Sequence, residues 1–146
     1  ASYRRYVNAP RTRSRMATLR GARARRVNTG AQGGAYDLAP MFTRLNRAYF
    51  GGRLHRPRLG WSTRTWRTQF GCFDPALDQI VLSRWLDRAA VPVYAVEYVL
   101  FHEMLHLRYP VEHNGGARRC VHTRAFKEAE KQFERLAEAK LLLRAL

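Results

Sequence analysis

The pentapeptide His102-Glu103-Met104-Leu105-His106 combines residue types and a spacing that can do metal chemistry. On a helix, residues four apart lie on the same face one turn from each other, so His102 and His106 can reach one metal ion. Glu103 lies about 100° round the helix from His102, which places it beside the open position of the metal. This H-E-x-x-H pattern is typical of zinc hydrolases, in which the glutamate acts as the general base.

The motif lies within an apolar run from Val91 to Leu107, which predicts a helix buried on most of its sides. We expect this helix to span residues 91–108 and to end at Tyr109-Pro110, because the residue before a proline disfavours helical backbone. Buried imidazole and carboxylate groups are costly unless they have polar partners. The alternative is a pair of core histidines beside a glutamate, each satisfied by hydrogen bonds and binding no metal.

A third ligand must come from elsewhere in the chain, because a catalytic zinc usually takes three protein ligands and leaves one position for water. The metzincin pattern would place a glycine at position 109 and a histidine at 112, and the chain has Tyr109 and Glu112 there, which excludes that class. His122 is the best placed candidate, because it follows a glycine-containing loop long enough to fold back onto the motif helix. The full set of candidates is His113, His122, Glu128, Glu130 and Cys72.

The other candidates have more ordinary interpretations. His113 follows the proline that ends the helix, and we expect it to be exposed or to act on the substrate side. Glu128 and Glu130 stand among lysines, which is typical of a solvated helix face. Cys72 lies in a β-like run, where a small core residue is the commoner role. His55 is interpreted as an ordinary surface histidine.

The remaining pattern predicts an α+β fold. Apolar residues recur at helical spacing from Asp37, and Gly51-Gly52 end this N-terminal helix. Short β-like runs follow at residues 58–62, 66–73 and 79–83, and a turn at 74–78 suggests a hairpin between the last two. A helical turn is expected at 84–88 and a polar loop around residues 115–116. The last predicted element is a C-terminal helix from about Thr123, its N-cap, to Arg144.

The chain of 146 residues has a formal net charge of +16, which is unevenly distributed. Residues 1–36 contain nine arginines and no acidic residue, while residues 37–146 carry a net charge of +7. Such a charge favours a polyanionic partner, DNA or RNA, although an arginine-rich solvated surface is the alternative. Tryptophans interleaved with arginines suggest either a surface that stacks single-stranded bases or, more ordinarily, core aromatics. These residues are Trp61, Trp66, Trp85, Arg58, Arg64, Arg67 and Arg84.

Residues 1–34 are interpreted as a basic arm that buries too little apolar surface to fold alone, and residues 35–146 as one domain. An arginine-rich organelle transit segment is an alternative for the arm. We expect no secretory signal and no membrane span, because no apolar stretch is long enough. The two cysteines form no C-x-x-C pair or disulfide framework, which favours a reducing compartment. We expect a cytoplasmic monomer, and association with the nucleoid is the alternative location.

Three blocks of sequence resemble one known family. They are residues 45–54 (LNRAYFGGRL), residues 98–106 (YVLFHEMLH) and residues 122–126 (HTRAF), in that order. Together they are similar to the SprT-like zinc metallopeptidase domain family, with its Spartan-like protease core. The likeness covers about residues 36–135.

This resemblance implies a compact α+β zincin-like core, and the β-like runs above predict its small three-stranded antiparallel or mixed sheet. It also implies Zn²⁺ held by His102, His106 and His122, with Glu103 as the general base. Spartan-type members cleave proteins attached to DNA, so DNA-associated proteins are the implied substrates. The chain departs from the longer members because it has no paired cysteines for a C-terminal zinc ribbon. The basic arm is our candidate substitute for that module.

The leading hypothesis is therefore a zinc-dependent endopeptidase that acts on nucleic-acid-associated proteins. A substrate strand is expected to pair with a sheet edge, for which residues 79–83 are our candidate. Tyr109, His113 and Arg118 are candidates for a second electrophile. One alternative is a non-catalytic nucleic-acid-binding protein with a structural zinc. Another is a non-peptidase zinc hydrolase with Cys72 as a ligand.

Overall fold

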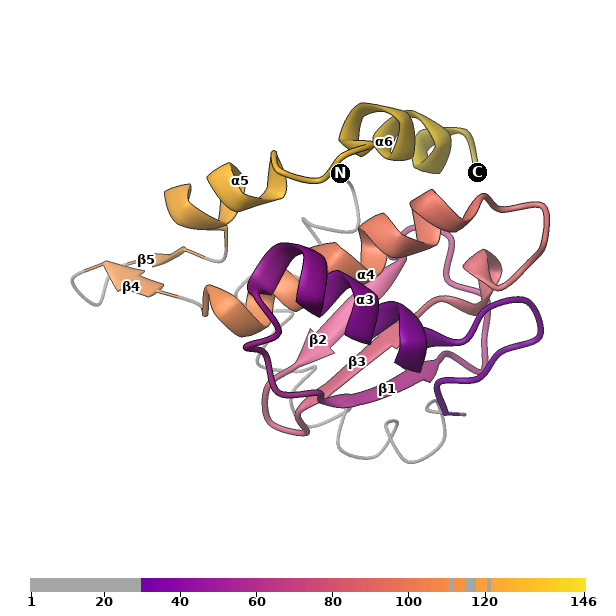
Figure 1. Ribbon diagram of the computed structural model, residues 1–146, viewed down its shortest axis with the longest axis horizontal. Coiled ribbons are helices and arrows are strands. Elements are labelled where there is room, and N and C mark those ends of the chain that lie inside the picture. The colour runs from indigo at the N-terminus through magenta and orange to yellow at the C-terminus, as the bar shows by residue number, and fades with distance from the viewer. Residues whose placement is uncertain (1–29, 111, 115–117, 121) are drawn as a thin grey trace.

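The computed structural model describes residues 30–110 and 122–146, together with the backbone of residues 112–114 and 118–120. Its described part is an α+β fold, as predicted, with a three-stranded mixed sheet and helices packed against it. Figure 1 shows helices α3 and α4 on one side of this sheet, with α5 and α6 beyond α4. Helix α4, which carries the H-E-x-x-H motif, therefore lies at the centre of the molecule.

Helix α3 (Leu38–Phe50) begins and ends where its sequence predicts. The Asp37 side chain accepts a hydrogen bond from the backbone N–H of Ala39, which caps the N-terminus. Gly51 ends the helix with a φ of 62°, a left-handed conformation that glycine adopts without strain. The buried Asn46 amide then bonds both the N–H and the carbonyl of Leu54, at 3.1 and 3.0 Å, and fixes the chain that leaves the helix.

The sheet contains β1 (Arg58–Trp61), β2 (Gly71–Asp74) and β3 (Gln79–Leu82) in the order β1-β3-β2. Strand β3 pairs parallel with β1 and antiparallel with β2. The prediction that residues 79–83 form a sheet edge is therefore wrong. All four residues of β3 are buried, and the strand has a neighbour on each side.

The second strand is shorter than the predicted run of residues 66–73. Residues 66–69 lie outside the ladder, where the Ser83 hydroxyl donates to the carbonyl of Trp66 at 2.7 Å and accepts from its N–H at 2.9 Å. The carbonyl of Phe70 accepts a bond from the N–H of Ser83. Regular pairing begins at Gly71. The predicted turn follows β2, where Asp74 accepts a hydrogen bond from the N–H of Ala76 and Asp78 adopts a φ of 49°.

Helix α4 (Val93–Arg108) is preceded by the short 3-10 helix η1 (Arg84–Leu86). Its residues from Ala95 to Leu105 are almost all buried, as the apolar run predicts, because the helix contacts the sheet and helices α3, α5 and α6. Within the described residues, no helix is long and apolar enough to cross a membrane.

The predicted C-terminal helix is wrong as a single element, because it is divided into α5 (Arg124–Glu130) and α6 (Leu136–Ala145). At the break Phe133 enters the core, where its ring centroid lies 5.2 Å from that of Phe101 and 5.6 Å from that of Tyr98. Burial of this aromatic ring outweighs a few helical hydrogen bonds, which the chain recovers in turns. The break also directs α6 back along α4.

The polar loop between α4 and α5 contains a short antiparallel pair, β4 (Glu112–Asn114) and β5 (Arg118–Cys120), which was not predicted. Figure 1 shows this pair projecting from the body of the domain. The hairpin returns the chain to α4 just before His122 and the start of α5.

Residues 30–34, the end of the predicted arm, pack against the domain. The Asp87 carboxylate accepts hydrogen bonds from the backbone N–H groups of residues 34–36 at 2.7–3.0 Å. The carbonyl of Gly30 accepts a bond from Trp61 of β1, and the carbonyl of Ala31 accepts one from the indole of the same residue. This segment therefore covers part of the β1 edge and leaves β2 as the better candidate for pairing with a further strand.

Candidate metal centre and its surroundings

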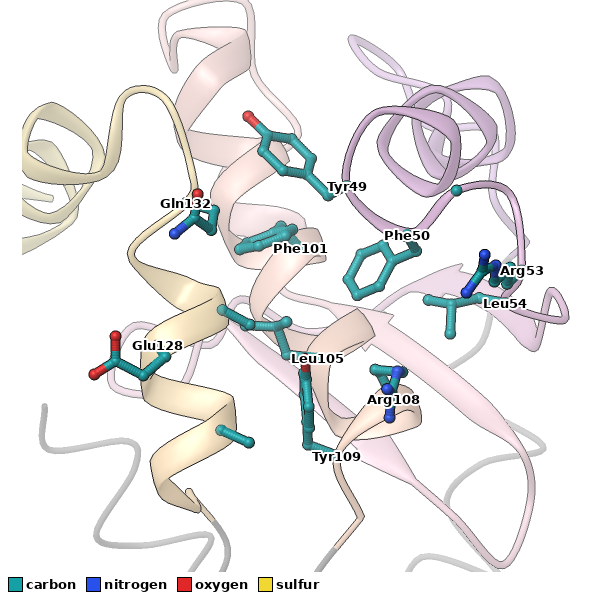
Figure 2. A pocket seen from close by; sticks show the side chains of 13 residues that line it. Tyr49, Phe50, Arg53, Leu54, Phe101, Leu105, Arg108, Tyr109, Glu128 and Gln132 are labelled. Atoms are coloured by element: carbon teal, nitrogen blue, oxygen red, sulfur yellow. The ribbon is translucent and has the colours of Figure 1, made fainter.

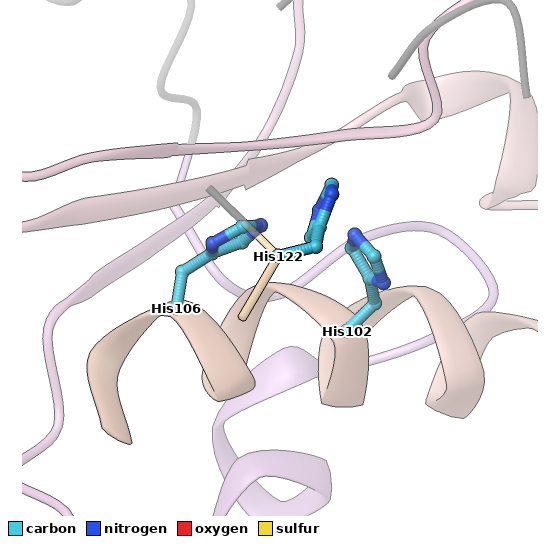
Figure 3. A group of neighbouring side chains, drawn as sticks. All are labelled: His102, His106 and His122. Carbon is cyan, nitrogen blue, oxygen red and sulfur yellow. The ribbon is translucent and has the colours of Figure 1, made fainter. Parts of the chain in front are cut away.

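Three imidazoles converge beside the middle of α4. One ligand atom from each of His102, His106 and His122 lies within 4.8 Å of the others. The ring centroids are 5.1–5.3 Å apart, and Figure 3 shows the three rings gathered above α4. Among the described residues, this group of closely spaced histidine, cysteine and acidic side chains has no fourth member.

Each of the three histidines is positioned by local structure. His102 and His106 are one turn apart on α4, as their spacing requires. His122 lies just before Thr123, whose hydroxyl accepts a hydrogen bond from the N–H of Phe126 and so caps α5. The capped start of α5 therefore places His122 opposite α4. His102 is fully buried, whereas His106 and His122 remain partly accessible.

The aromatic ring of Phe126 supports the cluster from one side. Its centroid lies 5.2 Å from that of His102, 4.8 Å from that of His106 and 4.7 Å from that of His122. The ring is 1% exposed, so it fills the space between α4 and α5 and excludes water from that side. Packing of this kind restricts the rotamers of the imidazoles.

Glu103 is buried against β2 rather than turned to solvent, with 4% of its surface exposed. A Cβ atom at Gly71 would lie 3.0 Å from the Cγ and Oε2 atoms of Glu103 and 3.0 Å from Val99. Glycine at the start of β2 thus leaves the space that the carboxylate occupies. The motif glutamate therefore lies between its own helix and the outer strand of the sheet.

Glu130 is buried, contrary to its predicted exposure. The neighbouring lysines predict a solvated face for both Glu128 and Glu130, and this holds only for Glu128, which is exposed and lies 3.5 Å from Lys131. Glu130 is buried, and its Oε2 lies 2.6 Å from Nδ1 of His102 and accepts a hydrogen bond from the Tyr98 hydroxyl at 3.0 Å. The spacing of four between Phe126 and Glu130, which places both on one face of α5, was the available signal.

The structure does not bring the other candidate ligands into the group. Cys72 is partly buried on β2 and is not a member of the cluster. His55 is exposed and bonds Asp78 at 2.9 Å, as expected of a surface histidine. The side chains of His113 and Arg118, which were candidates as ligand or electrophile, lie outside the described part of the chain.

Tyr109, the third candidate electrophile, lines a cavity of about 730 Å³ between α3, α4 and α5. Figure 2 shows this cavity, with Phe101 and Leu105 of α4 at its centre. None of the three clustered histidines lines it. The cavity therefore lies on a different face of α4 from the histidine group.

The tryptophans divide between core and partly covered positions. Trp61 is 2% exposed, so it belongs to the core. Trp85 is partly buried, and the guanidinium carbons of Arg67 and Arg88 lie 4.3 and 3.8 Å from its ring centroid. These guanidinium groups lie against the indole ring, which weakens the prediction that Trp85 stacks on bases. Arg64, Arg67 and Arg84 remain exposed around it.

Comparison with known families identifies the class of this protein. The pattern of the SprT-like family matches residues 38–142, which span α3 to most of α6. The chain therefore belongs to the SprT-like family. No curated protein and no solved structure matches it. Family membership and the histidine group together point to a metallopeptidase-type domain with a possible metal site.

Proposed function

We propose that this chain is a zinc-dependent endopeptidase. The observation that carries the proposal is the group of three imidazoles next to a buried glutamate on the same helix. A metal held only to brace the fold needs no carboxylate beside it. Glu103 therefore favours a catalytic role over a structural zinc.

The donor set fits zinc. Imidazole nitrogens suit this ion, and three protein ligands are the usual number at a catalytic site. In a tetrahedral site with Zn–N bonds of about 2.0–2.1 Å, ligand atoms lie roughly 3.4 Å apart. The three donors, all within 4.8 Å of one another, need only small side-chain rotations to reach that separation. When bound, zinc would supply Lewis acidity toward a peptide carbonyl and toward water.

Glu103 is proposed as the general base. Its carboxylate would accept a proton from the attacking water and then pass that proton to the amine that leaves. Burial against β2 holds the carboxylate in one place, so it needs little reorganisation during the reaction. His102, His106 and His122 are the residues that would hold the metal beside it.

The outer edge of β2, which pairs with no further strand within the described residues, is the proposed binding site for the substrate backbone. The N–H of Ser83 bonds the carbonyl of Phe70, so Cys72 also belongs to a hydrogen-bonded pair with β3. The backbone groups of Gly71 and Phe73 therefore point away from β3. The Gln69 side-chain amide donates to the Gly71 carbonyl at 3.3 Å, in keeping with a carbonyl that faces away from β3. An extended peptide could pair here beside Glu103.

Replacement of Gly71 tests this placement. In Gly71→Ala the added methyl group would displace the Glu103 carboxylate or the strand, and misplacement by about 1 Å can cost about 10²-fold in rate. We expect kcat to fall by about ten- to a hundredfold while metal content is retained. Peptidase assays with metal analysis would check this. Cys72→Ala on the same strand is the matched control, and we expect it to keep both metal and activity. Equal activity of the Gly71 variant and the native chain would contradict the placement.

Proteins associated with nucleic acid are the proposed substrates. The net charge of +16 supports a polyanionic partner, and exposed Arg64 and Arg67 lie in the loop that leads into β2. Nucleic acid bound at this loop would bring attached proteins close to the proposed substrate edge. DNA or RNA contact here is a proposal that rests on charge and position.

A proteolysis assay tests the proposed function. The native chain is incubated with a basic protein substrate, with and without single-stranded DNA, and cleavage is followed by gel and mass spectrometry. We expect cleavage that a chelator abolishes, that added zinc restores, and that single-stranded DNA increases. Cleavage that survives chelation would contradict the zinc mechanism. Binding of zinc and DNA without any cleavage would favour the non-catalytic alternative.

A further inference from the structure

We infer that Glu130 is a positioning residue that orients His102 for the metal. Helix α5 carries Glu130, and the proposed ligand His122 lies just before its N-cap. The inference rests on the metal site in the proposed function, and it adds a residue that the H-E-x-x-H motif does not contain. His102, Tyr98 and Glu130 form a buried hydrogen-bonded group, with exposed fractions of 1%, 2% and 6%.

The chemistry of the partners assigns a direction to the contact. An ionised carboxylate only accepts hydrogen bonds, and we take Glu130 as ionised, with Nδ1 of His102 as the donor in its 2.6 Å contact with Oε2. A neutral imidazole with its proton on Nδ1 presents the lone pair of Nε2 to a metal. The carboxylate therefore selects the tautomer that binds a metal and fixes the plane of the ring.

Tyr98 holds the carboxylate itself in place. Its hydroxyl donates to the same Oε2 atom at 3.0 Å from one turn before His102 on α4. A buried carboxylate is costly unless charge-assisted hydrogen bonds compensate its desolvation. Tyr98 and His102 are two such partners, both from α4, so Glu130 can occupy only a narrow range of positions.

The position of Glu130 follows from the spacing on α5. Phe126 and Glu130 are four residues apart in α5 and therefore share one face of this helix. His122 lies just before the N-cap of the same helix. Phe126 packs on all three imidazoles, and Glu130 reaches His102 one turn further on. Helix α5 thus couples the position of His122, which precedes it, to the orientation of His102 on α4.

The test measures metal affinity rather than cleavage. Metal-free native chain, Glu130→Gln and Tyr98→Phe are titrated with Zn²⁺ against a chromophoric chelator, and with Co²⁺ to record the visible absorption of its coordination shell. Removal of such outer partners typically weakens metal binding by about 10- to 100-fold. We expect a loss in this range for Glu130→Gln, a smaller loss for Tyr98→Phe, and an altered Co²⁺ spectrum in both.

Glu128→Gln is the matched control, because Glu128 lies on the same helix and is exposed. We expect its affinity and its Co²⁺ spectrum to equal those of the native chain. The melting temperature of each metal-free variant reports the fold separately. If Glu130→Gln does not fold, Tyr98→Phe decides: weakened binding supports the inference and native binding overturns it.

The outcomes separate this inference from the proposed function. Native affinity and an unchanged spectrum in Glu130→Gln would overturn the role of Glu130 and leave the zinc peptidase proposal standing. Absence of zinc and cobalt binding by the native chain would overturn both. Weakened binding by the Glu130 variant with a normal Glu128 control would support the inference even if no cleavage were found.

Discussion

Glu103→Gln is expected to keep the fold and the bound metal but to lose peptide cleavage. The substitution preserves the shape of a buried side chain that lies against Gly71, so the packing of α4 on β2 is retained. An amide cannot accept the proton from water that a carboxylate accepts. A positioned general base typically contributes 10²–10⁴-fold in rate, and we expect kcat to fall by about that factor.

The measurement is a steady-state peptidase assay together with zinc content and melting temperature. The matched control is Glu97→Gln, because Glu97 is also on α4 but pairs with Arg44 on α3, away from the histidine group. We expect this control to retain cleavage. Full activity of the Glu103 variant with metal bound would refute the assignment of the base. Loss of metal from that variant would indicate that Glu103 supports the site instead.

His122→Ala is expected to weaken metal binding far more than replacement of His55 or His113. A structural zinc site in a small peptide contributes about 10–16 kcal/mol in total, so one of four ligands accounts for roughly 3 kcal/mol. This corresponds to about a hundredfold in affinity. The loss should be seen by chelator competition, and cleavage at limiting zinc should fall with it.

Two other histidines provide the comparison. His55→Ala removes an exposed imidazole that bonds Asp78, and we expect native metal affinity. His113→Ala removes the competing candidate for the third ligand, and we expect a much smaller effect than that of His122→Ala. If His113→Ala weakens zinc binding more than His122→Ala does, the third ligand is His113 and not His122. Equal and small effects of both would mean that the three-histidine group does not bind the metal.

Local pattern alone determined a large part of this fold. The apolar run around the motif predicted a buried helix, and α4 spans 93–108 against a predicted 91–108. Asp37 and Gly51 bounded α3 as expected, because capping depends on residues within one turn of the helix end. The three blocks of sequence also predicted the family, which the match over residues 38–142 confirms. Each of these inferences depends on neighbours in sequence.

The strand order depended on the path of the chain in three dimensions. Residues 79–83 are the middle strand and not an edge, and no local feature states which strands a run will pair with. The run itself, Gln79–Leu82, is uniformly buried, and a short apolar run does not distinguish a central strand from one that is covered on one side. The choice of β2 as the substrate edge is available only once this order is known.

The sequence by itself determined that His102, Glu103 and His106 share one buried helix, because helical periodicity connects residues that are near in the chain. Only the tertiary structure brought a ligand atom of His122 to within 4.8 Å of those of His102 and His106, and only it showed Glu130 as a buried partner of His102 rather than a solvated acid. The break after α5 has the same origin, since the core that accepts Phe133 is built by α3 and α4. Burial is a property of what packs against a residue, and those partners are distant in sequence.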